Sequence, residues 1–83
     1  MASKEWTVRL SIDEQGDLTR AIAILTGEEG VLVHAEGSAR RNPNDRRAPW
    51  IGDELAVSRS LYALADRLMD LAARDIDLVA GHG

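Results

Sequence analysis

The sequence predicts an α+β fold: a three-stranded antiparallel meander, then one long amphipathic helix and a short C-terminal helical turn. Two observations carry this prediction. Apolar residues alternate with a period of two in the first half of the chain, and recur at helical spacings of three and four in the second half. An arginine- and proline-rich stretch, residues 40–50, separates the two halves. At 83 residues the chain is short enough to form a single domain, residues 1–83.

Three strand-like segments make up the first half. Residues 5–14 alternate apolar and polar side chains, which is typical of a half-buried strand. Residues 18–26 and 31–39 each follow a short cluster of glycine and acidic residues of the kind found in turns. Connections this short favour antiparallel pairing between consecutive strands.

The middle strand is apolar on both faces. One face carries Ala21, Ala23 and Leu25, and the other carries Ile22 and Ile24. A strand in a sheet covered by one helix needs only one apolar face. The sequence does not indicate which face packs under the helix.

The second half predicts a helix that begins near residues 51–54, with Asp53 as the N-cap. Its apolar stripe is Val57, Leu61, Leu64, Leu68 and Leu71. The opposite side is expected to carry Arg59, Asp66, Arg67, Asp70 and Arg74. Acidic residues are unfavourable at a helix C-terminus, so Asp75 is expected to cap a new short turn, residues 76–80.

A homodimer is expected because the core is thin and the sheet has open edges. The chain has no phenylalanine, so leucine, isoleucine, valine and alanine must build the core. Unpaired sheet edges also invite another strand. The candidate dimer-interface residues are Ile22, Ile24, Leu55, Tyr62 and Met69. The alternative for the last three is that they wrap around a curved core.

No constellation of catalytic or metal-binding residues is found, and we expect neither an enzyme nor a cofactor, metal or small-molecule substrate. The absence of cysteine excludes disulfides, thiol catalysis and cysteine-based zinc sites. His34 and Glu36 would share a strand face, but two ligands do not make a zinc site, and His82 lies near the chain end. No apolar run is long enough to span a membrane, so a cytoplasmic protein without membrane contact is expected.

The stretch between the two halves is the candidate nucleic-acid site. It carries four arginines and one aspartate, whereas the whole chain has a net charge of −4. Guanidinium groups suit phosphate, and a nearby tryptophan can stack on a base. The candidate residues are Arg40, Arg41, Arg46, Arg47 and Trp50. The alternatives are a solvated loop whose arginines pair with the chain's own acidic surface, and a contact with an acidic protein.

Several short motifs carry a resemblance to a known family. They are Trp6-Thr7-Val8, Ser11-Ile12-Asp13-Glu14, Asn42-Pro43 and Ile51-Gly52-Asp53-Glu54-Leu55. With these motifs the chain resembles a small actinobacterial family of unknown function that is grouped with double-stranded-RNA-binding-like (dsRBD-like) folds and includes mycobacterial proteins linked to hypoxia and dormancy. The resemblance implies a dsRBD-like domain that forms a homodimer, similar in outline to ribosome hibernation promoting factors. It brings no catalytic residues.

Two departures weigh against the usual mode of double-stranded RNA binding. The chain begins with a strand rather than a helix, and Asp53 and Glu54 stand where phosphate-binding lysines are expected. The first hypothesis is therefore a non-enzymatic stress- or dormancy-associated module that docks on the ribosome or RNA through its arginines. The alternative is a homodimeric protein-interaction or regulatory module without nucleic-acid contact.

Overall fold

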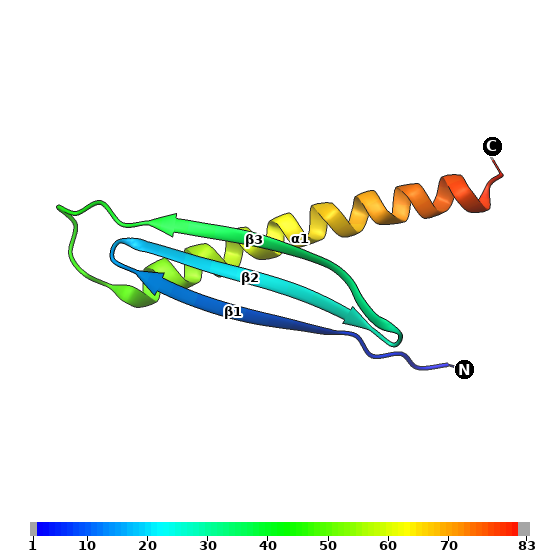
Figure 1. Ribbon diagram of the computed structural model, residues 1–83, viewed down its shortest axis with the longest axis horizontal. Helices are drawn as coiled ribbons and strands as arrows, with labels where there is room; N and C mark the ends of the chain where they lie inside the picture. Colours follow the sequence, from blue (N-terminus) through cyan, green and yellow to red (C-terminus); the bar gives the residue numbers. More distant parts are fainter. Residues whose placement is uncertain (1, 82–83) are drawn as a thin grey trace.

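The computed structural model describes residues 2–81, and it confirms the predicted α+β architecture. The elements follow the order β1 (Thr7–Gln15), β2 (Leu18–Gly27), β3 (Gly30–Arg40) and α1 (Pro49–Val79). The strands form one antiparallel sheet in the order β1-β2-β3. The helix runs across one face of this sheet and continues past its end (Figure 1). His82 lies outside the described residues.

Cross-strand pairing shows which face of β2 lies under the helix. Ala23 pairs with Leu10 on β1 and with Ala35 on β3, so these three side chains share one face. Ala23 and Ala35 are buried under α1, together with Leu64 of the helix. The face of Ala21, Ala23 and Leu25 is therefore the inner face, and that of Ile22 and Ile24 is the outer one.

A close contact at Gly37 sets the position of α1 on the sheet. A Cβ atom at Gly37 would lie 2.6 Å from the carbonyl oxygen of Ala56 and closer still to the backbone nitrogen of Ser60. Ser60 is fully buried, and its hydroxyl donates to the carbonyl of Val57 at 2.7 Å. Glycine on β3 and small residues on α1 thus allow the helix backbone to touch the strand.

The buried core is as thin as the composition predicts. Among residues 2–81, seven apolar residues are buried: Ala21, Ala23, Leu25, Ala35, Ala39, Ala56 and Leu64. Five of the seven are alanines, and the largest fully buried side chain is that of Ser60. The larger apolar side chains of the chain are mostly half-buried or exposed.

The predicted helix ends are wrong at both termini. The helix begins at Pro49, and the N-cap is Ala48, without any side-chain cap, rather than Asp53. Proline suits the first helical turn because it needs no hydrogen-bond acceptor and its φ is already helical. At the other end α1 continues through Asp75 to Val79, so the separate turn over residues 76–80 does not exist. This part of α1 contains no glycine or proline, so nothing in it favours a break.

The predicted sides of the helix are also partly wrong. The buried line along α1 is Ala56, Ser60 and Leu64, and Leu61 of the predicted stripe is 40% exposed. Arg59, expected on the far side, donates from Nη1 to the carbonyl of Ser38 at 2.8 Å. Arg67 likewise donates to the carbonyl of His34 at 2.9 Å. Because both arginines reach β3, the opposite flank of α1, which carries Leu61, faces the side of β1.

Candidate functional site

Arg41 holds the arginine-rich loop against the sheet. Its backbone N–H donates to the carbonyl of Asp17 at 2.8 Å, and its Nη2 pairs with Asp17 Oδ1 at 2.6 Å. Its Nη1 donates to the carbonyl of Asp45 at 2.7 Å. Both partners of the ion pair are largely shielded from solvent, which strengthens a charge-assisted hydrogen bond. Arg41 therefore ties residues 41–48 to the turn between β1 and β2.

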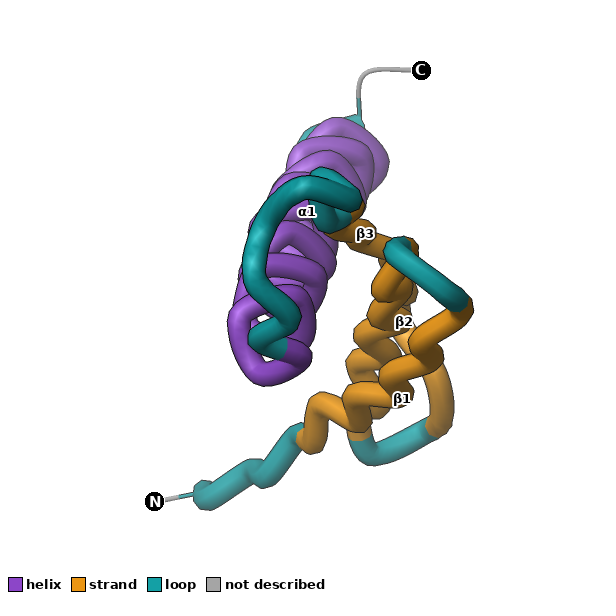
Figure 2. Tube along the Cα trace, turned by 90° about the vertical axis from the view of Figure 1, so that its left-hand side faces the viewer, coloured by secondary structure: helices purple, strands orange, loops and turns teal. Residues whose placement is uncertain are grey.

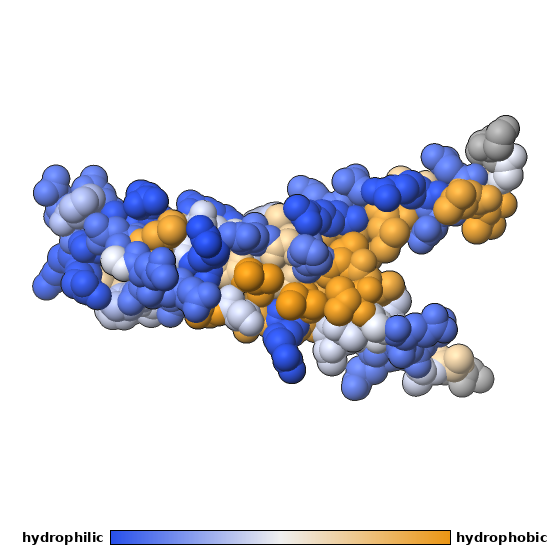
Figure 3. All heavy atoms as spheres, in the orientation of Figure 1, coloured by the Kyte–Doolittle hydropathy of each residue, from blue (hydrophilic) through white to orange (hydrophobic). Residues whose placement is uncertain are grey.

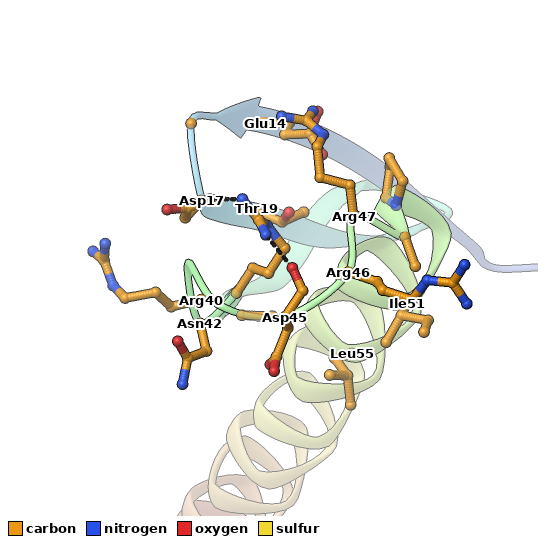
Figure 4. A pocket seen from close by; sticks show the side chains of 16 residues that line it. Glu14, Asp17, Thr19, Arg40, Asn42, Asp45, Arg46, Arg47, Ile51 and Leu55 are labelled. Carbon is orange, nitrogen blue, oxygen red and sulfur yellow. Dashed lines mark hydrogen bonds and ion pairs between the residues drawn. The ribbon is translucent and has the colours of Figure 1, made fainter.

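The other three arginines of the stretch are exposed and point in different directions. Within residues 2–81, no ion pair or side-chain hydrogen bond involves Arg40, Arg46 or Arg47. Figure 4 shows Arg40 and Arg46 on opposite sides of the loop, and Arg47 extended beside Glu14. Trp50, in the first turn of α1, is 63% exposed. The loop thus offers free guanidinium groups, but it does not gather them around one point.

A cavity of about 350 Å³ lies between this loop, the β1–β2 turn and the first turns of α1 (Figure 4). Its apolar lining includes Ala39, Ile51 and Leu55. Thr19 also lines it and is only 5% exposed. Sequence reasoning missed this cavity, because its walls come from four separate segments and no local pattern marks them.

The residues proposed for the dimer interface lie on two opposite faces of the molecule. Ile22 and Ile24 are half-buried on the outer face of the sheet. Leu55, Tyr62 and Met69 are all exposed on α1, and their seven-residue spacing places them on the side of the helix away from the sheet. The structure therefore does not bring the two groups together into one surface.

Polar side chains flank the isoleucine pair on the outer face. Ile22 lies between Ser11 and Glu36 of the neighbouring strands, and Ile24 lies between Arg9 and His34. Glu36 is itself paired with Arg20 at 2.8 Å. The isoleucines form a small apolar island rather than an extended apolar face.

A larger uncovered apolar surface lies on the inner face, where α1 packs over β2 and β3 and leaves β1 open (Figure 2). All nine residues of β1 are exposed. We call the apolar part of this surface the open apolar face; its residues are Trp6, Val8, Leu10 and Ile12 beside β2, and Leu61 on the facing flank of α1. Figure 3 shows apolar side chains gathered between the helix and the sheet. The alternation in residues 5–14 predicted that this strand has an apolar face. The sequence did not predict that the helix would leave this face uncovered.

No metal or membrane-spanning element is found in the described part of the chain. Among residues 2–81 no three potential metal ligands cluster, and His34 and Glu36 lie on the exposed outer face. The helix α1 lacks the apolar length required to cross a bilayer.

Comparison with known proteins identifies the family. A family model described as Rv2632c-like matches residues 4–83. The chain belongs to the Rv2632c-like family. The resemblance to a small actinobacterial family is therefore confirmed.

Members of the Rv2632c-like family from mycobacteria align with most of this chain. An uncharacterized protein of Mycobacterium bovis, Mb1767, is 49% identical over 76 residues, which cover 92% of this chain and 80% of the relative. Rv2632c of Mycobacterium tuberculosis, also named uncharacterized, is 38% identical over 74 residues, covering 89% of this chain and 78% of Rv2632c. Membership of the Rv2632c-like family thus brings no activity with it.

The fold of the Rv2632c-like family is also seen in a solved structure. The crystal structure of Rv2632c superposes on this chain with a TM-score of 0.85 at 34% sequence identity. The match covers 100% of this chain and 96% of that one. The meander followed by one long helix is therefore the Rv2632c fold.

Proposed function

We propose that this protein is a cytoplasmic, non-enzymatic interaction module that acts as a homodimer, in which a second copy covers the open apolar face. One observation carries the proposal: β1 is a nine-residue edge strand, exposed throughout, with an apolar inner face. Natural proteins protect long edge strands with charges, bulges or a covering element. The inner face of β1 has no such protection at Val8, Leu10 or Ile12.

The occupant that fits best is another copy of this chain. Leu71 and Leu78 continue the line of Ser60 and Leu64 along α1 toward its C-terminal part, which extends past the end of the sheet (Figure 1). Leu78 is 76% exposed. The chain therefore has an uncovered apolar strand and an apolar helix end with nothing beneath it. In a two-fold dimer the C-terminal end of α1 of each copy would lie beside β1 of the other copy. Both copies then use the same surface, which consists of β1 and the helix end.

Burial of the open apolar face supplies a substantial part of the association energy. Val8, Leu10 and Ile12 are each about two-fifths to one-half exposed. Fully burying such a side chain is worth about 1.5–3 kcal/mol, so covering the exposed part contributes about 1 kcal/mol each. The same contacts would add large aliphatic side chains to a core built mostly of alanine.

The test is light scattering at tens of micromolar protein, where the wild type is expected to have twice the 9.1 kDa chain mass. Leu10→Glu should give a monomer with unchanged helical circular dichroism, because it places a charge on the open apolar face. Ile24→Glu, at the cross-strand neighbour of Arg9 on the outer face, is the matched control and should remain a dimer. The proposal would be contradicted if the wild type were a monomer. It would also be contradicted if Ile24→Glu dissociated the dimer and Leu10→Glu did not.

A second candidate function is docking on the ribosome or another structured RNA, as part of a stress or dormancy response. It is supported by the three exposed arginines, Arg40, Arg46 and Arg47, which have no ion-pair partner within residues 2–81. Neutralised phosphates release counterions, so such binding should weaken steeply as salt is raised.

Sedimentation with ribosomes of the source organism tests this second function. The triple Arg→Ala variant at positions 40, 46 and 47 should lose co-sedimentation at low salt, with Arg41 kept because it holds the loop. The matched control removes three exposed positive charges elsewhere: Lys4→Ala, Arg9→Ala and Arg74→Ala. Equal binding by both variants, or no wild-type binding at low salt, would exclude the arginine-loop contact.

A further inference from the structure

The cavity beside the arginine loop has the size of a small-molecule site. Its volume of about 350 Å³ falls within the range of about 300–1,000 Å³ that is typical of ligand pockets. It lies at the end of the molecule near the β1–β2 turn, away from the Leu71–Leu78 end of α1 (Figures 1 and 4). A ligand here would therefore be independent of the dimer contact proposed above.

The cavity walls are held in place by hydrogen bonds. Arg41 joins the loop to Asp17 and Asp45, as described above. Within the loop, the N–H of Asp45 donates to the carbonyl of Asn42 at 2.9 Å, and the N–H of Asn44 donates to Asn42 Oδ1 at 3.0 Å. A site whose walls are already ordered loses less entropy on binding.

The wall of the cavity combines apolar side chains with the hydroxyl of Thr19. Thr19 is 95% buried, and none of the side-chain hydrogen bonds within residues 2–81 uses its hydroxyl. No buried side-chain polar atom of the described residues lacks a hydrogen-bond partner, so the Thr19 hydroxyl is open to the cavity, where a ligand can hydrogen-bond to it. A Cβ atom at Gly52 would lie 2.9 Å from Thr19 Oγ1, so glycine keeps the space beside the hydroxyl open. Ile51 and Leu55, both nearly half exposed, provide the apolar surface next to it.

The electrostatics of the cavity favour an anion. With the Arg41–Asp17 pair set aside, the lining charges are Arg40, Arg46 and Arg47 against Glu14 and Asp45. The helix also begins here, without a capping side chain and without an acidic residue in its first turn. Its dipole therefore adds positive potential to that of the arginines.

We propose that this cavity binds a small organic anion, whose carboxylate or phosphate group is attracted by the positive potential of the lining arginines Arg46 and Arg47 and of the start of α1, and whose apolar body lies against Ile51 and Leu55. The hydroxyl of Thr19 hydrogen-bonds to a polar atom of the ligand. The proposal concerns binding of the ligand and includes no chemical step. A small-molecule ligand was not expected from the sequence, which indicated only that the arginine stretch suits phosphate.

The test is a ¹H–¹⁵N NMR titration of the full chain with phenyl phosphate and, separately, with benzoate. At least one of the two should cause saturable shifts at the amides of Gly16, Thr19 and Gly52. Benzyl alcohol, which lacks the charge, and inorganic phosphate, which lacks the apolar body, should each bind at least tenfold more weakly. Shifts that are absent with both anions, or that map to the open apolar face instead, would overturn the proposal, as would equal binding of inorganic phosphate.

Variants locate the two halves of the site. Arg46→Gln with Arg47→Gln should lower the affinity for the anion by about tenfold or more, because the cavity loses two of its lining positive charges. Arg9→Gln with Arg74→Gln removes the same charge elsewhere and should leave the affinity within twofold. Thr19→Val keeps the shape of the side chain and should weaken binding severalfold. If the two double arginine variants lose affinity for the anion equally, the attraction is a general effect of net charge. If neither double variant changes the affinity, the ligand binds elsewhere. Either result refutes the proposed site.

Discussion

The contact between Gly37 and α1 makes a sharp prediction, because a single methyl group should disrupt the packing of helix on sheet. In Gly37→Ala the new Cβ would lie 2.6 Å from the carbonyl oxygen of Ala56 and 2.7 Å from the carbonyl carbon of Arg59. These atoms belong to the helix backbone and have no rotamer by which to move away. The helix must therefore shift as a body, or β3 must bend.

The expected cost follows from the geometry. Ordinary contact begins near 3.4 Å, and 3.4 − 2.6 = 0.8 Å must be recovered at Ala56. Moving α1 by this amount loosens the buried contacts of Ser60 and Leu64, and overpacking of this kind costs typically about 1–3 kcal/mol. Without a clash, glycine to alanine would instead stabilise by about 0.4–1 kcal/mol through the unfolded chain. The difference between these two terms predicts a net loss of about 1–2 kcal/mol in the free energy of unfolding.

Thermal unfolding followed by circular dichroism at 222 nm measures this loss. For a domain of this size it corresponds to a fall in Tm of about 5–15 °C. The matched control is Gly27→Ala, where the new Cβ would meet the side chain of Leu32 at 3.0 Å, and a side chain can move. Gly27→Ala should change the free energy by less than about 1 kcal/mol. A Gly37→Ala protein as stable as wild type, at equal concentration, would refute this account of the packing.

Three further predictions concern single contacts, each measured by urea unfolding at pH 7. Asp17→Asn should lower the free energy of unfolding by about 1 kcal/mol, and the double variant with Arg41→Gln should lose less than the sum of the two single variants, because both single variants break the same ion pair; additive losses would show that the pair contributes nothing. Arg59→Met keeps the aliphatic stem but loses the bond to Ser38, and should cost about 0.5–1.5 kcal/mol; no change would mean the bond contributes nothing. Ser60→Leu should cost more than Ser60→Ala, by about 1–3 kcal/mol, because the site is filled; equal stability would show free space there.

The strands were predictable because their patterns are local. The alternation of residues 5–14 placed β1, and the turn clusters placed both hairpins to within about one residue of Gly16 and Gly30, which both adopt positive φ. The helix was predictable as an element, but not in its ends. Asp53 is a better capping residue than Ala48, yet the chain enters the helix earlier, through Pro49.

The candidate sites were less predictable, because they depend on where α1 lies. The arginines could be named from the sequence, but not that Arg41 would pair with Asp17, 24 residues earlier. Ile22 and Ile24 attracted attention as apolar residues on a second face, whereas the larger uncovered surface lies around Leu10 on the inner face. The arginines that line the cavity beside Thr19 stand out in the sequence, but nothing in the sequence indicates that a cavity forms there.

The sequence by itself determined the elements, their order and the thinness of the core, since these follow from the periodicity and from a composition rich in alanine and without phenylalanine. Only the tertiary structure decided which surfaces remain open. Gly37, Ala56 and Ser60 allow close contact only over β2 and β3, so the helix leaves β1 uncovered. The position of α1 on the sheet depends on the distance between the backbones of the helix and the strand, to within fractions of an ångström. A pattern of apolar residues along the sequence contains no such distance.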